Sequence, residues 1–221
     1  MLNAVPPQRV ASLDELGVSK KLFSDATDWA TAQTRSCTEL DAPAMAGITF
    51  WSRTNRFLAE VLTDPERTTV PWRRTARDSI LRVVHPDATH AITAISGHGG
   101  VGDLDAKVRT KNPKGSAMAH LVENNAKYEP NGQGVFLSRD DVEFGRELDD
   151  IPLWFLLYER KKNGKLSAEL ALPIKMEGRY VNQWLQRIPL FHGKTDPGFD
   201  VALLDAAVES TTEVSVEIKN L

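Results

Sequence analysis

Two stretches near the beginning of the chain carry apolar residues at the spacing of an amphipathic helix. The first covers about residues 12–33 and predicts one or two helices, since Gly17 interrupts the apolar positions. Ser12 and Glu15 have the spacing of a capping box at a helix start. The second covers residues 44–62, and its apolar positions near one face are Ile48, Trp51, Leu58 and Leu62. We therefore expect an N-terminal helical part over about residues 12–63, with this apolar face buried.

From about residue 79 the apolar period changes to the alternation of strands. Residues 79–84 and 91–96 are expected to be strands, joined by a turn that contains Pro86 and Asp87. A helix is expected from Asn112-Pro113 to about residue 125, because Asn is a favoured N-cap and Pro a favoured first residue. Residues 212–219 alternate well enough to predict a last strand.

The clearest element is a hairpin over residues 152–173, in which Asn163-Gly164 separates two apolar-rich strands. A two-residue turn would place Tyr158 opposite Glu169 and Leu157 opposite Leu170. One face of the hairpin would then be apolar and buried, with Leu153, Phe155, Leu157, Leu166, Leu170 and Leu172 on it.

These elements together predict an α+β fold in a single domain, residues 1–221, with a mixed sheet part over about residues 79–221. The expected sheet is antiparallel and built around the 152–173 hairpin. The N-terminal helices and the central helix are expected to pack on one face of it.

Composition narrows the class of protein. The chain is 41% apolar and 26% charged, which is typical of a globular protein and not of a disordered one. Cys37 is the only cysteine, so a disulfide scaffold is excluded. There is no apolar run long enough to span a membrane and no secretory signal, so a cytoplasmic protein without a membrane partner is expected. No motif predicts a cofactor.

Charge is distributed unevenly. The net charge is −3, which argues against a general polyanion binder. Four cations nevertheless surround the expected helix start at residue 112: Lys107, Arg109, Lys111 and Lys114. A helix N-terminus attracts anions, and these cations would strengthen a phosphate site. Arg73, Arg74 and Arg77, beside Trp72, could extend the patch. The alternative is a solvated basic loop.

A glycine-rich stretch, residues 97–102, has the letters of a dinucleotide fingerprint. A fingerprint loop should open directly into a helix, and no helix is expected after Gly102. A loop without phosphate is therefore favoured here.

Two groups of residues suggest a metal. His85, Asp87 and His90, with His98 nearby, are ligand types that a turn could bring together, although their spacing fits a plain turn equally. Asp200 with Glu217 and Lys219 has the order found in many Mg²⁺ nucleases.

Three functions remain. The leading one is a non-catalytic accessory or interaction protein that contacts nucleic acid or a protein partner through residues 107–114. The second is a metal-dependent phosphodiesterase or nuclease. The third is a structural subunit that docks on a partner, or self-associates, through an exposed hairpin edge or the Trp184 segment, residues 180–189.

Overall fold

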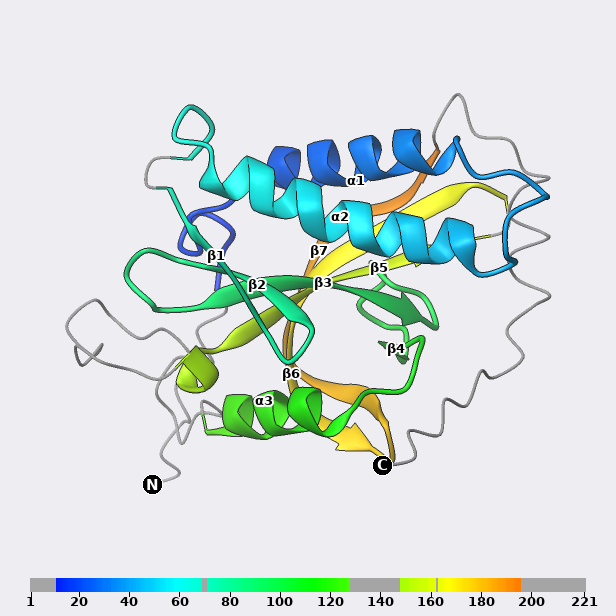
Figure 1. The fold of residues 1–221 in the computed structure, drawn as a ribbon. Coiled ribbons are helices and arrows are strands. Elements are labelled where there is room, and N and C mark those ends of the chain that lie inside the picture. The colour runs from blue at the N-terminus through cyan, green and yellow to red at the C-terminus, as the bar shows by residue number, and fades with distance from the viewer. Residues whose placement is uncertain (1–10, 69–70, 128–147, 162, 196–221) are drawn as a thin grey trace, which may run out of the picture.

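The computed structural model describes residues 11–68, 71–127, 148–161 and 163–195. This part of the chain contains three α-helices and a seven-stranded, mostly antiparallel sheet, which confirms the α+β fold (Figure 1). None of the helices in these ranges is both long enough and apolar enough to cross a membrane. The predicted strand at 212–219 lies outside the described residues.

The first helix begins later than the sequence predicts. The capping box forms, with the Ser12 N–H donating to Glu15 at 2.9 Å and the Glu15 N–H donating to Ser12 Oγ at 3.2 Å. It caps only a short turn, which ends where Gly17 adopts a positive φ of 64°. Helix α1 (Lys20–Thr34) starts anew behind the N-cap Ser19. Of the one or two helices predicted over residues 12–33, the structure has one α-helix, preceded by this turn.

Helix α2 (Met45–Thr63) confirms the second predicted helix, but its buried face differs from the prediction along the first half. Leu58 and Leu62 are fully buried against the sheet, whereas Ile48 and Trp51 are 54% and 42% exposed. In the N-terminal half of α2 the side chain that enters the core is Phe50, which is 1% exposed, whereas Ile48 and Trp51 line a cavity.

The sheet has the strand order β1-β2-β3-β5-β6-β7, with β4 paired to β3 outside this path. The strands are β1 (Arg73–Arg77), β2 (Ile80–Val84), β3 (Ala91–His98), β4 (Arg109–Thr110), β5 (Leu153–Arg160), β6 (Lys165–Glu177) and β7 (Tyr180–Thr195). The edges of the main path are thus β1 and β7. The sequence does not predict β1 or the long β7.

One strand pair is parallel. Strands β3 and β5 are paired in parallel, from Ala91–Leu153 to Ser96–Tyr158, and α3 (Ser116–Ala126) lies between them in sequence. A parallel pair needs such a crossover, so β3, α3 and β5 form a βαβ unit. Helix α3 starts at Ser116, with Gly115 as N-cap, rather than at the predicted Asn112-Pro113.

The helices cover both faces of the sheet, which corrects the expectation that all of them pack on one face (Figure 1). Helices α1 and α2 share one core with Trp154, Leu156 and Tyr158 of β5. Helix α3 shares the other with Leu153 and Phe155. A strand buried on both faces has an uninterrupted apolar sequence, which explains the run 153–158.

The hairpin of β5 and β6 is confirmed, but its register differs by one residue from the prediction. Leu156, not Leu157, is opposite Leu170. The Gly164 N–H donates to the Lys161 oxygen at 3.0 Å, and Gly164 has a φ of 75°, so the turn is longer than the two residues assumed. A shift of one residue exchanges faces: Leu166 and Leu170 lie on the side of Leu156.

The hairpin is also internal, because β5 lies beside β3 and β6 lies beside β7. It has no exposed edge with which to dock on a partner, so that part of the structural-subunit hypothesis is wrong. Trp184, within β7, is half-buried; its Nε1 donates to the Val108 oxygen at 2.9 Å and its ring meets Phe155 edge-to-face. The 180–189 segment is therefore a strand of the sheet.

Candidate anion-binding cavity

A cavity of about 470 Å³ opens where β2 separates from β3. Only Val83–Ile92 and Val84–Ala91 pair between these strands, yet β3 continues to His98. Beyond Ile92 the side chain of Asn55, from α2, takes the place of a strand: it accepts from the Ala94 N–H at 3.0 Å and donates to the Ala94 oxygen at 3.1 Å. The Asn55 amide thus satisfies both backbone groups of Ala94, and it leaves space beside this edge of β3.

Five segments line the cavity. They are the N-terminal half of α2, the β1–β2 turn, the end of β3, residues 111–118 at the start of α3, and the end of β5. The carboxyl ends of the parallel strands β3 and β5 therefore meet the N-terminus of α3 at this cavity. In α/β units this is the place where ligands, and phosphates in particular, bind.

Two of the four predicted cations, Lys111 and Lys114, line the cavity. No ion pair within the described residues involves either of them. The backbone of Lys114 is fixed to the β6–β7 turn, since its N–H donates to the Arg179 oxygen at 2.7 Å. Burial lowers the pKa of Lys114 to about 8. A positive charge here is thus costly until an anion accompanies it.

The start of α3 adds backbone donors to the same wall. Among the described residues no side chain caps this end, and the first helical N–H with a partner is that of Ala119, which donates to the Gly115 oxygen at 3.1 Å. The preceding N–H groups, including those of Ala117 and Met118 at the cavity, make no hydrogen bond within the described residues. Free N–H groups and the helix dipole both favour an anion.

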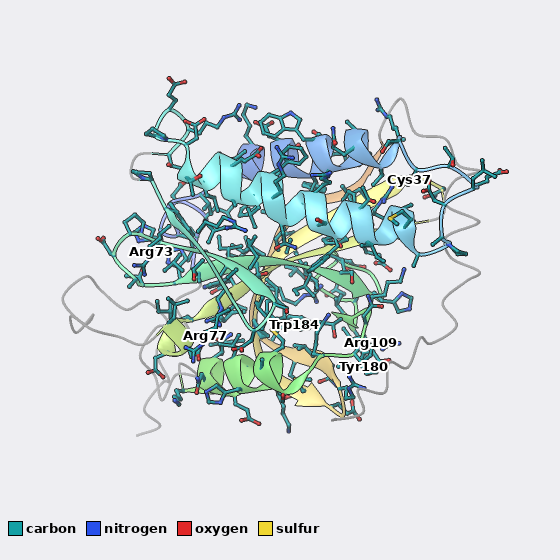
Figure 2. All side chains as sticks on the ribbon, in the orientation of Figure 1. Cys37, Arg73, Arg77, Arg109, Tyr180 and Trp184 are labelled. Atoms are coloured by element: carbon teal, nitrogen blue, oxygen red, sulfur yellow. The ribbon has the colours of Figure 1, made fainter. Side chains whose placement is uncertain are left out.

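The other two cations of the basic loop do not reach the cavity. Arg109 lies over the ring of Tyr180 at 4.5 Å, with both residues together in Figure 2. Lys107 is exposed, and it does not line the cavity. The four cations are close in sequence but not in space: the pairing of β4 with the end of β3 keeps Lys107 and Arg109 away from the cavity that Lys111 and Lys114 line.

Arg73 and Arg74 also lie apart from Lys111 and Lys114. Strand β1 runs from Arg73 toward its turn at the cavity, so Arg73 is at the far end, roughly 13 Å away along the strand. Figure 2 shows Arg73 well separated from Arg109. Arg77 is paired with Asp149 at 3.2 Å. The arginines form an exposed basic edge strand rather than an extension of the cavity.

The glycine-rich loop binds carboxylates of the protein itself. The N–H groups of Gly99, Gly100 and Val101 donate to Glu159 at 3.3, 3.0 and 3.0 Å, and that of Gly102 donates to Glu169 at 2.8 Å. These donors are the ones that a phosphate would need. Because Glu159 and Glu169 occupy them, the arrangement agrees with the prediction of a loop without phosphate at residues 97–102.

Sequence reasoning misses the aromatic residues of the cavity, which also include Phe50. Trp51 and Tyr158 both line it, from α2 and from the end of β5. Each follows an apolar pattern, and such a pattern cannot distinguish a core from a cavity wall. Tyr158 reaches the cavity because β5 pairs in parallel with β3, a long-range contact that the local sequence pattern does not show.

The histidines predicted as metal ligands form a packing cluster. The rings of His85 and His90 stack at 5.0 Å, and Trp72 meets both edge-on. Both ring nitrogens of His90 are engaged, with Thr89 Oγ1 at 2.9 Å and the Leu16 oxygen at 3.1 Å. Burial is the main cause that lowers the pKa of His90 to about 3, so its ring is neutral.

The other proposed ligands do not join this cluster. Asp87 donates its backbone N–H to His85 Nδ1 at 3.2 Å, as in an ordinary turn, and His98 lies near Glu159 instead. Within the ranges that the structure describes, no three His, Cys, Asp or Glu side chains are grouped as a metal site would require. Asp200, Glu217 and Lys219 lie outside the described residues.

The cavity therefore combines cationic and apolar side chains with two carboxylates, Asp78 and Glu159, of which Glu159 accepts from the glycine-rich loop and Asp78 lies 3.8 Å from Arg77. Comparisons of the chain with protein-family models, with curated protein sequences and with solved structures find no match.

Proposed function

We propose that the protein is a non-catalytic binding protein whose cavity holds a phosphate group of a nucleic acid or nucleotide. One observation carries the proposal: Lys111 and Lys114, neither in an ion pair with a described residue, line one cavity together with the uncapped start of α3. A phosphate between them would accept hydrogen bonds from both ammonium groups and from backbone N–H groups.

The overall charge of −3 fits such a local site better than a broad nucleic-acid surface. Phosphate contact in a cavity needs a few aimed donors, whereas binding along a duplex needs many cations on one face. The single cysteine, a buried free thiol, agrees with a reducing compartment, and we place the function in the cytoplasm.

The experiment is fluorescence polarisation with a short labelled single-stranded DNA or RNA that carries a 5′-phosphate. We expect binding by the wild type that weakens steeply as salt rises, and no binding by Lys111→Glu plus Lys114→Glu. The matched control is Lys107→Glu plus Lys175→Glu, which changes the net charge equally at two exposed lysines outside the cavity.

The control variant should retain most of the affinity. Equal losses in both double variants would mean a general charge effect and would remove the cavity from the proposal. Failure of the wild type to bind any phosphate-bearing probe would end it. Preference for a phosphorylated peptide over every nucleic acid would identify a protein partner instead.

A further inference from the structure

The side chain of Tyr158 is almost fully buried at the wall of the cavity. Tyr158 lines the cavity and is only 5% exposed, and no hydrogen bond within the described residues involves its hydroxyl. Its ring is fixed by Phe50, whose centroid lies 4.9 Å away in an edge-to-face contact. Burial raises the pKa of Tyr158, so the hydroxyl keeps its proton and remains a donor.

Hydroxyls of buried tyrosine side chains usually have a hydrogen-bond partner, which is a protein group, water or a ligand. Tyr158 lines the cavity, and its hydroxyl is not among the described side-chain atoms that are both sealed from solvent and unpartnered, so water in the cavity reaches it in the free protein. A ligand with an acceptor atom at this position would take the place of that water.

The rim of the same cavity exposes a large apolar surface. Trp51 is 42% and Ile48 is 54% exposed, and both come from the N-terminal half of α2. An indole left open beside cationic side chains offers a flat surface on which an aromatic ring can stack.

We infer that the cavity takes one nucleotide unit, with its phosphate at Lys111 and Lys114, its base stacked on Trp51, and an acceptor on the base bonded to the Tyr158 hydroxyl. This inference rests on the proposed function and specifies its ligand. The volume, about 470 Å³, lies in the range of small-molecule sites. The nucleotide is either free or at the end of an unpaired strand, because the bases of a duplex are stacked and paired.

The test is titration calorimetry with the four ribonucleoside monophosphates and with ribose 5-phosphate, which keeps the phosphate and lacks the base. We expect one or more nucleotides to bind at least tenfold more tightly than ribose 5-phosphate. Tyr158→Phe should weaken the best nucleotide about tenfold and leave ribose 5-phosphate unchanged. Its midpoint of urea unfolding should not fall, since the lost hydroxyl had no partner among the described residues.

Trp51→Ala should weaken the nucleotide about tenfold or more, again without an effect on ribose 5-phosphate. Trp29→Ala is the matched control, because Trp29 is 37% exposed and does not line the cavity. A short single strand with a 5′-phosphate that matches or exceeds the free nucleotide would identify the strand end as the source. Weaker binding by the strand would identify the free nucleotide.

The outcomes separate the two proposals. Binding of neither nucleotides nor ribose 5-phosphate would end the proposed function and this inference together. Ribose 5-phosphate as tight as every nucleotide, unchanged affinity in Tyr158→Phe and Trp51→Ala, or equal binding of a duplex would overturn the inference and leave the phosphate site intact. A fall in stability of Tyr158→Phe without a change in affinity would assign the hydroxyl a structural role.

Discussion

Arg187 and Glu169 form a two-pronged ion pair between β7 and β6, with Arg187 Nε and Nη2 at 2.8 and 2.7 Å from the two carboxylate oxygens. Glu169 is fully buried. The guanidinium also donates to the backbone oxygens of Asp103 and Ala106, at 2.7 and 3.0 Å. The pair therefore links the loop after β3, within the βαβ unit, to strands β6 and β7.

Arg187→Met should lower the free energy of unfolding by about 3–5 kcal/mol, because it leaves a buried carboxylate without its counterion. Urea unfolding at neutral pH measures the change. Glu169→Leu combined with Arg187→Met should recover most of the loss, since the charge is then removed as well. A surface control is Lys21→Met, which breaks an exposed helical pair with Asp25 and should cost about 0.5 kcal/mol or less. Similar costs for the buried and surface pairs would contradict this account.

The stability of the protein should fall in mild acid because of His90. The pKa of His90 is about 3 in the folded state, against an ordinary value of 6.5. Below about pH 6.5 the unfolded chain therefore binds a proton at His90 that the folded chain does not bind. The free energy of unfolding should decrease as the pH falls, by about 2 kcal/mol between pH 7 and pH 5. The pKa of His85 is lowered too, mainly by burial, and adds in the same direction.

The measurement for His90 is urea unfolding at the two pH values for the wild type and for His90→Gln, whose amide can still donate to the Leu16 oxygen. The variant should lose less stability on acidification, because the carboxylates contribute equally to both proteins. Identical pH dependence in the two proteins would show that His90 does not carry the effect.

The three helices and strands β2, β3, β5 and β6 could be predicted from the sequence, whereas β1, β4, β7 and the arrangement of the elements could not. The Asn-Gly hairpin is present, yet its register depends on whether Gly164 closes a two-residue or a longer turn, and both fit the same letters. The alternation of apolar and polar residues does not assign the two faces of β5, because Leu153–Tyr158 is apolar throughout. Such a run is typical of a strand that is buried on both faces. The parallel pair with β3 is a long-range contact, for which the local pattern holds no signal.

The candidate site was predictable in part for the same reason. Lys111 and Lys114 follow from their position at a helix start, which is a local property. Lys107 and Arg109 are excluded only by the pairing of β4 with β3, and Tyr158 is included only by the position of β5. Spatial convergence from separate strands cannot be deduced from spacing along the chain.

Lys114 should make ligand binding dependent on pH in the alkaline range. With a pKa of about 8 in the free protein, the side chain is mostly charged at pH 7 and mostly neutral at pH 9. If the phosphate requires the charged form, its affinity should fall about tenfold between these values. Lys114→Arg, which stays charged, should remove this dependence in polarisation or calorimetry. A tenfold fall that persists in Lys114→Arg would assign the titration to another group.

The turn between β1 and β2 carries backbone strain. Asp78 and Ser79 have φ values of 52° and 60°, a conformation that suits glycine and that other residues adopt at a cost. Ser79→Gly should therefore raise the free energy of unfolding by about 0.5–1 kcal/mol, after allowance for the freedom that glycine adds to the unfolded chain. Ser79→Ala keeps the strained backbone and should bring no gain. Stabilisation of equal size by both substitutions would contradict the strain argument.

Gly47 offers a way to close the cavity without damage to the fold. It lies in the third helical position of α2 and lines the cavity, and a Cβ atom built on it meets nothing within 4 Å. Gly47→Ala should stabilise the protein by about 0.5–1 kcal/mol, because alanine favours a helix more than glycine does.

Gly47→Leu should be similarly stable, but its longer side chain enters the space that a ligand would use. We expect it to weaken phosphate-bearing ligands at least tenfold while its unfolding midpoint stays at or above that of the wild type. Loss of binding in Gly47→Leu together with retention in Gly47→Ala would locate the ligand in the cavity, since neither variant alters a charge. Full binding by Gly47→Leu would place the ligand on the outer surface of the basic loop instead.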